Sequence, residues 1–545
     1  MKEKYLPTLE NKKSVSIFEQ RSIGGLCRQD GATGDQVYDM KNMAYAFGGG
    51  IKTRPLHRRY VSVESDEEFG HGICVHNGDL YVARGTALYR VVGCDSLARV
   101  CSLSNTDKIF VTFGDRLFIL PDRVYVDADN VVRPLDVSVT GVEVQADESG
   151  SLVSSTVDWA TQGICEGDGI TLSCASAPKN DGAYRVASVQ GQTLVLDRPL
   201  AVTGTVTVSV NRCLPPVSYL CVTGNRLMGC AGHTVYISEA GNPFNWCAVA
   251  DLGSSAPVDI QTGGQGEFTG CTCWQGYGLF LKEDRIYKLM GSGAYGYYLS
   301  ETAAPGVAAG EAKTLSVQGG ALYYKGVSGV YRYEGSYPVS IGDALGENIQ
   351  YACAAGDHAY YYMAGLGEAG MPCLYTFDTQ REAWYAADDS LYIRFMVNRG
   401  GKIYALNNFG EVWQLGNDWE PTHTGTSEEE VRGPLWASVT FGYESCRLPE
   451  RHTLSEGRCP TESQRLQKVT LLADALMGMS GIPTMTVWIA YDDEEEWREI
   501  GHFEGPFSHR LLDCPLIPRT CDHYRLMWET TGDWTVHRVY RTYEH

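Results

Sequence analysis

A hairpin-sized pattern recurs along most of the sequence, and it limits the fold more than any other feature. Each copy has a short apolar strand, a turn of Gly, Asn or Asp, and a second strand that carries Tyr or Phe. About seven copies occur, at residues 73–90, 109–125, 219–237, 277–288, 321–333, 359–377 and 402–415. A single hairpin is marginal in water, whereas blades that pack face to face around an axis bury one another's aromatic faces. The repeat predicts an all-β protein with a β-propeller of about seven blades; a sandwich of hairpins without radial closure is the alternative.

The length and composition indicate several folded domains. A chain of 545 residues exceeds one ordinary core, since domains average roughly 100 to 200 residues. Apolar residues make up 43% of the chain and charged residues 20%, a balance typical of folded protein. We therefore expect about three domains joined by short linkers.

Interruptions of the repeat mark the expected domain boundaries. Short alternating strands with Gly and Asp at their turns break the period once, and they predict a small β-barrel inserted into a propeller loop. Alternating strands also resume after the last copy and predict an antiparallel β-sandwich. The expected parts are an extended N-terminal arm (1–60), the propeller (61–136 and 217–415), the barrel (137–216), a linker (416–433) and the C-terminal sandwich (434–545).

The N-terminal arm combines frequent glycines with apolar side chains. Its glycines interrupt every apolar run, so it cannot build a core alone, yet side chains such as Ile23, Leu26, Met40 and Met43 need burial. We expect the arm to lie in extended form against the protein's own blades or against an adjacent subunit. A chain without residues 1–45 should then leave a soluble propeller that fails to assemble.

The formal charge of −21 makes nucleic acid an improbable direct partner of the whole surface, because an acidic surface repels phosphate. An acidic surface would suit the wall of a channel through which DNA passes without binding. A local basic patch is conceivable at Arg54, His57, Arg58 and Arg59. A solvated edge or an ion-paired interface explains the same residues, and we favour that interpretation.

The cysteines and the apolar segments bear on the compartment. The eighteen cysteines are scattered and form no Cys-x-x-Cys pair, although Cys271 and Cys273 share one face of an expected strand. Buried free cysteines in a reducing compartment are favoured over a disulfide framework or zinc. The N-terminal residues lack an apolar signal region, and no stretch reaches the ~20 apolar residues of a membrane helix. We expect a soluble protein made in the cytoplasm, with no membrane span.

Two clusters near the C-terminus contain residue types that can bind metals. The acidic run from Asp492 to Glu496 lacks the Gly that bends a calcium loop, so an exposed hairpin turn between residues 487 and 500 is the better interpretation. A loose group without close ligand spacing is ordinary packing or surface; its members are His502, His509, Cys514, Cys521, His523 and His537.

Motifs for catalysis are absent from the sequence. It has no Gly-x-Ser-x-Gly elbow, phosphate-binding P-loop or His-Glu-x-x-His zinc motif. We therefore assign no catalytic, cofactor-binding or metal-binding residue, expect no cofactor, and expect no enzyme. Paired carboxylates from different blades would leave no local spacing, so a propeller glycosidase stays open as a minor alternative.

A resemblance rests on residues 235–246, where a strand ending in Ser238 leads to a Gly-Asn-Pro turn and Trp246. This segment resembles a motif of propeller-type virion proteins of tailed bacteriophages. It also distantly resembles the Asp-box of sialidases, but Ala240 stands where that box has Asp. The N-terminal residues 40–55, the inserted module and residues 465–538 are similar to parts of phage stabilisation or tail-accessory proteins.

The resemblance implies a structural virion protein at the head–tail junction or in the tail, synthesised in the host cytoplasm. It implies a cyclic homo-oligomer around the DNA channel, in contact with portal, adaptor or tail proteins and with DNA that passes without specific binding. A tail protein that binds surface glycans is the alternative, with Trp159, Trp384 and Trp419 stacking on sugar rings. The glycosidase ranks below both.

Overall fold

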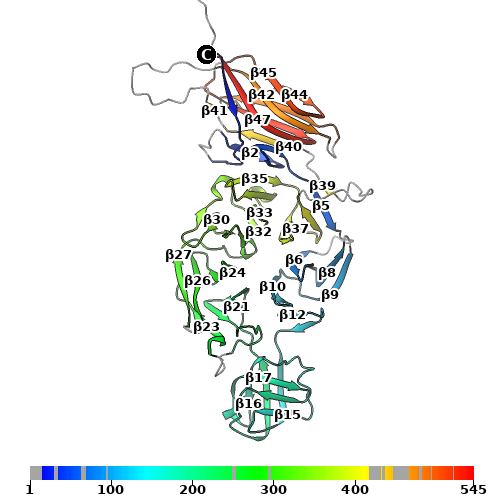
Figure 1. Cartoon of the computed structure of the whole chain (residues 1–545), viewed down its shortest axis with the longest axis vertical. Helices are drawn as coiled ribbons and strands as arrows, with labels where there is room; N and C mark the ends of the chain where they lie inside the picture. Colours follow the sequence, from blue (N-terminus) through cyan, green and yellow to red (C-terminus); the bar gives the residue numbers. More distant parts are fainter. Residues whose placement is uncertain are drawn as a thin grey trace, which may run out of the picture.

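The chain forms three bodies in a row: a sandwich at one end, a propeller in the middle and a small barrel at the other end (Figure 1). The computed structural model is all-β apart from five short 3-10 turns in its described part. It describes residues 15–29, 35–62, 69–93, 96–247, 253–292, 296–416, 431–432, 436–442, 444–445, 465–477, 481–492, 494–519 and 521–544.

The middle body is the predicted β-propeller, with seven antiparallel sheets as blades in the described part of the chain. The strands of the first four blades, in chain order, are β6 (Gly70–His76), β7 (Asp79–Arg84), β8 (Ala87–Gly93), β9 (Ser96–Ser102); β10 (Ile109–Phe113), β11 (Arg116–Leu120), β12 (Val124–Val126), β13 (Val132–Pro134); β20 (Tyr219–Thr223), β21 (Arg226–Ala231), β22 (Thr234–Ile237), β23 (Val258–Gln261); and β24 (Gly270–Trp274), β25 (Tyr277–Leu281), β26 (Arg285–Ser292), β27 (Gly296–Ala303).

The remaining three blades complete the ring, and at most of the junctions between blades the first strand of one blade lies beside the first strand of the next. Their strands are β28 (Ser316–Gln318), β29 (Ala321–Lys325), β30 (Val330–Tyr333), β31 (Val339–Ser340); β32 (Gln350–Gly356), β33 (Tyr360–Leu366), β34 (Pro372–Asp378), β35 (Ala383–Asp388); and β36 (Ile393–Arg399), β37 (Lys402–Asn407), β38 (Val412–Leu415) with β5 (His57–Val61) from the N-terminal part.

Turn chemistry and aromatic packing explain why these residues form blades. At the first hairpin, Asn77 and Gly78 both have positive φ (50° and 83°), as a two-residue turn between twisted strands requires. Between neighbouring blades, apolar side chains such as Trp274, Tyr324 and Tyr333 form a shared buried cluster. The blades thus cover one another's aromatic faces, as predicted.

A closed six-stranded barrel interrupts the ring between β13 and β20, as the sequence predicted. Its first and last strands pair with each other, with Ser138 opposite Asn211, so the insertion leaves and re-enters the propeller at one place. Its core surrounds the fully buried Trp159. The strands, in order around the barrel, are β14 (Ser138–Ala146), β15 (Ser151–Ser154), β18 (Thr193–Leu196), β17 (Gly182–Gln190), β16 (Gly169–Cys174) and β19 (Gly204–Arg212).

The C-terminal body is a sandwich of two antiparallel sheets around a common core. One sheet contains β3 (Met43–Ala46), β4 (Gly50–Thr53), β47 (Asp533–Glu544), β42 (Arg465–Leu476) and β45 (Phe507–Pro515), with β1 (Val15–Gln20) also paired to β47. The other contains β2 (Val37–Lys41), β40 (Ala437–Phe441), β46 (His523–Thr531), β43 (Thr484–Tyr491) and β44 (Arg498–Glu504), with β41 (Glu444–Ser445) also paired to β46.

The N-terminal segment is more than the extended arm that the sequence predicted. It contacts a blade, since the Leu26 amide donates to the Trp384 carbonyl (2.8 Å), but its strands β1 to β4 are members of the sandwich sheets. The sequence predicts a sandwich in residues 434–545 alone, because local patterns cannot reveal partners that lie about 500 residues away. Removing residues 1–45 would therefore take strands from the sandwich as well.

The expected linker at residues 416–433 is described only at Gly416 and at β39 (Val431–Arg432), and the rest lies outside the described residues. Strand β39 adds to the outer edge of the last blade by pairing with β5. In the described part of the chain, no helix has the length and apolar character needed to cross a bilayer.

Candidate functional site

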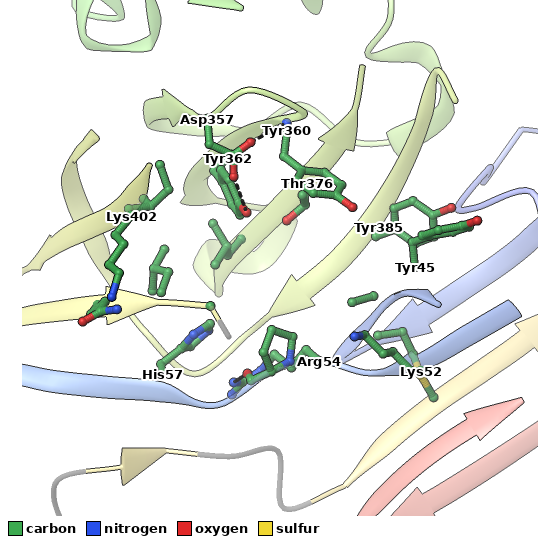
Figure 2. A pocket seen from close by; sticks show the side chains of 18 of the residues that line it. Tyr45, Lys52, Arg54, His57, Asp357, Tyr360, Tyr362, Thr376, Tyr385 and Lys402 are labelled. Atoms are coloured by element: carbon green, nitrogen blue, oxygen red, sulfur yellow. Dashed lines mark hydrogen bonds between the residues drawn. The ribbon is translucent and has the colours of Figure 1, made fainter. Parts of the chain in front are cut away.

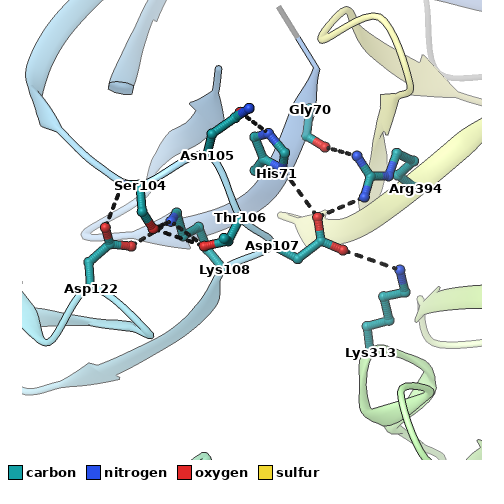
Figure 3. A network of polar contacts seen from close by, with 10 residues as sticks. All are labelled: Gly70, His71, Ser104, Asn105, Thr106, Asp107, Lys108, Asp122, Lys313 and Arg394. Carbon is teal, nitrogen blue, oxygen red and sulfur yellow. Dashed lines mark hydrogen bonds and ion pairs between the residues drawn. The ribbon is translucent and has the colours of Figure 1, made fainter. Parts of the chain in front are cut away.

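One mouth of the propeller axis contains a network of charged side chains from several blades (Figure 3). It forms where the inner strands begin: His71 in β6, Asp107 just before β10, Arg394 in β36 and Lys313 in the turn before β28. Asp107 Oδ1 lies 2.7 Å from Arg394 Nη2 and 3.2 Å from His71 Nδ1, and its Oδ2 lies 3.9 Å from Lys313 Nζ. Arg394 also donates to the Gly70 carbonyl at 2.9 Å.

A second acid–base pair supports the same loop from behind. Lys108 is buried and donates to Asp122, Ser104 and Thr106, which fixes the loop that carries Asp107 (Figure 3). Burial opposes ionisation of Asp122, but the hydrogen bonds from Lys108 and Ser104 outweigh it and lower the pKa of that carboxyl. The network therefore ties blades 1, 2, 5 and 7 together across the mouth.

The charged groups at this mouth form an ionic brace, a set of ion pairs that holds several blades together. Both oxygens of Asp107 face cations, so this carboxylate is positioned to bind its own neighbours. Glu311, close to Lys313 in sequence, is largely enclosed, and burial raises the pKa of its carboxyl. A cavity of about 640 Å³ lies against β28, β32 and β36, and its lining includes Gln318, Asn398, Asp357 and His358 beside small residues such as Ala354.

A second cavity, of about 280 Å³, lies where the sandwich meets blades 6 and 7 (Figure 2). Tyr45 and Lys52 line it from β3 and β4, and Tyr360, Tyr385 and Lys402 line it from the blades. Ligand pockets usually enclose roughly 300 to 1,000 Å³, so this space is at the small end of that range. The aromatic and cationic side chains that line it form part of the contact between the sandwich and the propeller.

A buried ionic triad seals one side of this contact (Figure 2 shows Arg54 and His57). Arg54, which follows β4, and His57, the first residue of β5, lie 3.4 Å and 3.1 Å from Asp388 Oδ2 at the end of β35. All three side chains are almost fully buried. Burial and the Arg54 charge lower the pKa of His57; burial opposes ionisation of Asp388, but its contacts with His57 and Arg54 lower its pKa. Together with the Arg59–Glu411 pair, these contacts confirm that the basic residues Arg54 and Arg59 are ion-paired.

Arg28 forms another bridge between the same two bodies. It reaches Asp39 of β2 at 2.9 Å, Glu347 beside blade 6 at 3.0 Å and the Tyr375 hydroxyl of β34 at 3.0 Å. Three partners from separate elements hold one guanidinium, an arrangement that its planar donor geometry favours. The sandwich is thus fixed to the propeller by two ionic joints.

The segment that carried the phage resemblance forms the joint with the barrel. Glu239 is buried, and its Oε2 lies 3.2 Å from Nε of Arg185 in the barrel while it accepts hydrogen bonds from Asn242 and Asn245. Asn242 Nδ2 also donates to the Gly167 carbonyl of the barrel (2.5 Å). A Cβ atom on Gly169 would lie only 2.2 Å from Asn245 Oδ1, so the approach requires glycine.

The barrel is also fixed at its exit from the propeller. Arg212, at the end of β19, contacts Asp168 at 2.8 Å, and both side chains are buried. The same guanidinium donates to the carbonyls of Pro134 and Leu135, which connect blade 2 to the barrel. Breaking such a buried pair on one side costs about 3 to 5 kcal/mol.

The structure shows the surroundings of several residues that the sequence suggested as functional. Trp159 and Trp384 are buried (0% and 1% exposed) and donate to backbone carbonyls, so neither can stack on a surface sugar as the glycan alternative proposed. Trp419 lies outside the described residues. Asp492 and Glu494 lie in the turn of the predicted hairpin, where Glu494 pairs with Arg498 and Arg519; Asp493 is outside the described residues.

The cysteines and histidines divide into separate groups. The described cysteines are all free and mostly buried, Cys271 among them, as the sequence predicted.

Of the loose C-terminal group, the structure brings His509 and His537 together, with Asp474 between them. Asp474 was not predicted, because its partners lie 35 and 63 residues away on other strands. The mouth residues were missed for the same reason, since a propeller collects its axis residues from distant blades.

Comparisons with known proteins find similar folds at low identity. No family model matches the chain, and no curated protein does. Three similar solved structures are BamB from Moraxella catarrhalis (8% identity, 70% of this chain and 96% of that chain, TM-score 0.34), a catalytically inactive virginiamycin B lyase from Staphylococcus aureus with quinupristin (8%, 66% and 98%, 0.33), and the computationally designed Ika8 protein (10%, 66% and 100%, 0.35). At these values they carry no information on function.

Proposed function

We propose that this chain is a structural, non-catalytic protein of a tailed-bacteriophage virion, at the head–tail junction or in the tail. In this proposal it works as a cyclic oligomer and binds its neighbours through broad surfaces. The sandwich and the barrel, at opposite ends of the molecule, are the two contact ends (Figure 1).

The observation that supports this proposal most directly is the way in which the ends are attached. The sandwich is held by Arg54–Asp388 and Arg28–Glu347. The barrel is held by Arg185–Glu239 and by hydrogen bonds from Arg212 to the carbonyls of Pro134 and Leu135. The Arg54–Asp388 pair is almost fully buried on both sides, and Arg212 is itself fixed by a buried pair with Asp168 inside the barrel. Domains of one chain move relative to each other by default unless their interface is extensive. A connector that carries load between two partners needs the fixed joints found here.

The ionic brace at the propeller mouth fits the same role. Propeller enzymes need side chains that converge on a substrate, whereas Asp107 is surrounded by Arg394, His71 and Lys313 of its own chain. A brace of this kind stiffens the ring, which favours a load-bearing body.

Gene deletion in the encoding phage tests the role. We expect filled heads without attached or complete tails, and a loss of infectious particles that the full-length chain restores in trans. Deletion mutants that yield complete, infectious virions would contradict a structural role.

A barrel-deleted chain tests the arrangement of the contact ends. Because Ser138 and Asn211 are paired neighbours, a short Gly-Ser linker can replace residues 138–211 without separating blades 2 and 3. We expect this protein to keep its strand-rich circular dichroism spectrum and the thermal transition of the propeller but to fail in complementation. A control chain with Trp436, an exposed residue of the sandwich, changed to Ala separates loss of a module from loss of one surface residue.

A further inference from the structure

A cluster of side chains of the types that bind metals lies on one sheet of the sandwich. Three neighbouring strands supply one residue each: His537 from β47, Asp474 from β42 and His509 from β45. Asp474 Oδ2 lies 2.7 Å from His537 Nε2, and Asp474 Oδ1 lies 3.2 Å from His509 Nδ1. The three ligand atoms all lie within 4.8 Å of one another.

Irregularities in both neighbouring strands bring the histidines to Asp474. Between β42 and β47 the register shifts at Leu472 and Ala473, which leaves His537 as the extra residue of a bulge. Between β42 and β45 it shifts between Ala473 and Ala475, opposite His509, whose φ is +48°. Bulges redirect side chains and are over-represented next to functional sites.

The donor set matches the preferences of a transition metal. Imidazole nitrogens suit zinc, copper, iron and nickel, and two histidines with one carboxylate form a known ligand set that leaves positions open. Zinc takes nitrogen and carboxylate oxygen at 2.0 to 2.2 Å, which places tetrahedral ligands about 3.3 Å apart. The present spacing therefore needs only small side-chain rotations.

The carboxylate of Asp474 is held in a fixed orientation. The His509 amide (2.5 Å) and Ser508 Oγ (3.2 Å) donate to its Oδ1. Such supporting hydrogen bonds orient ligands in metal sites.

We propose that Asp474, His509 and His537 bind one divalent transition-metal ion of the zinc type, with the remaining coordination positions facing solvent. The ion links β45 to β42 and β47. This inference is independent of the proposed virion role, because it depends only on the geometry of the sandwich.

Titration of the full chain with Zn²⁺ tests the site by calorimetry, after the free thiols have been alkylated so that cysteines do not compete. We expect one equivalent of Zn²⁺ to bind, with affinity reduced about tenfold or more in each of H509A, H537A and D474N. Co²⁺ should give the visible spectrum of nitrogen and oxygen coordination, without a thiolate charge-transfer band. Zn²⁺ should also raise the melting temperature of the wild type and leave that of H537A unchanged.

The matched control is H502A. His502 is an exposed histidine on β44 whose Nε2 lies 3.7 Å from the carboxylate of Glu504, and among the described residues this pair belongs to no cluster of three metal-binding side chains. H502A should bind Zn²⁺ like the wild type. Equal affinity of the wild type, H509A and H537A, or a stoichiometry that falls to zero after alkylation, would overturn the proposal. H509A changes an exposed side chain, so its fold, checked by circular dichroism without metal, should be unaltered.

Discussion

Replacing Asp388 by Asn should loosen the joint between the sandwich and the propeller. The change keeps the size of the side chain but removes the negative charge that lies 3.4 Å from Arg54 and 3.1 Å from His57. Arg54 is 2% exposed, so water cannot replace the lost partner. The variant therefore removes the carboxylate that this buried guanidinium contacts.

The expected cost follows from what Arg54 retains. Removing one partner of a buried ion pair costs about 3 to 5 kcal/mol. Arg54 keeps hydrogen bonds to Asn42 Oδ1 and the Pro55 carbonyl, both 2.9 Å, which favours the lower end of that range. A loss of about 3 kcal/mol corresponds to a roughly hundredfold increase in the population of the opened joint.

Native-state hydrogen exchange is the appropriate assay, because a chain of several bodies does not unfold in one two-state step. Peptides that cover β3, β4 and β5 should lose about a hundredfold protection in D388N, while barrel peptides, at the opposite end of the molecule, should not change. Removing both partners in R54M/D388N should restore most of the protection, because no unpaired charge is left.

The matched control is R498Q, which removes a solvent-exposed partner of Glu494 and should change protection by less than about threefold. Two results would refute the reasoning. One is a D388N effect no larger than that of R498Q; the other is an equal loss of protection in the barrel.

Three further predictions concern the pH response, the barrel core and the barrel joint. Because burial and Arg54 lower the pKa of His57, the unfolded chain takes up a proton below about pH 6.5 while the folded chain does not. Stability should therefore fall as the pH drops below about 6.5, and H57Q should flatten this part of a plot of urea midpoint against pH. W159A should destabilise the barrel by about 3 to 5 kcal/mol, because it removes a fully buried indole, and exchange of barrel amides will measure the loss. G169A should force the barrel away from Asn245 and speed protease cleavage at the connections of the barrel, whereas G141A, at a bulge of β14 with positive φ and no atom near its Cβ position, should strain only that strand.

The repeat made the propeller and the barrel predictable from local patterns. Alternating strands with Asn-Gly and similar turns, as at Asn77 and Gly78, report directly on hairpins, and seven of them leave few ways to bury their aromatic faces. The break in the period located the insertion. These features depend on neighbours within about 20 residues, which a sequence displays.

The sites depend on contacts that a sequence does not display. Arg54 meets Asp388, Arg394 meets Asp107, and His537 meets Asp474 only after the ring and the sandwich have closed. Even the resemblance at residues 235–246 gave no hint that Glu239 and Asn242 hold the barrel. Bulges are equally hidden, because one extra residue in a strand leaves the apolar pattern almost unchanged.

Strand β1 near the start of the chain pairs with β47 at its end, with Val15 opposite Glu544. Because β1 is synthesised long before β47, it cannot form this pairing until the end of synthesis. At about 5 to 20 residues per second, roughly half a minute to two minutes separates the emergence of the two strands from a ribosome. During that interval β1 to β4 have no sheet to join, and β5 has no last blade to complete. Their apolar faces then need either a chaperone or a transient partner, so a ribosome-bound chain stalled before residue 465 should recruit holding chaperones that a released chain does not.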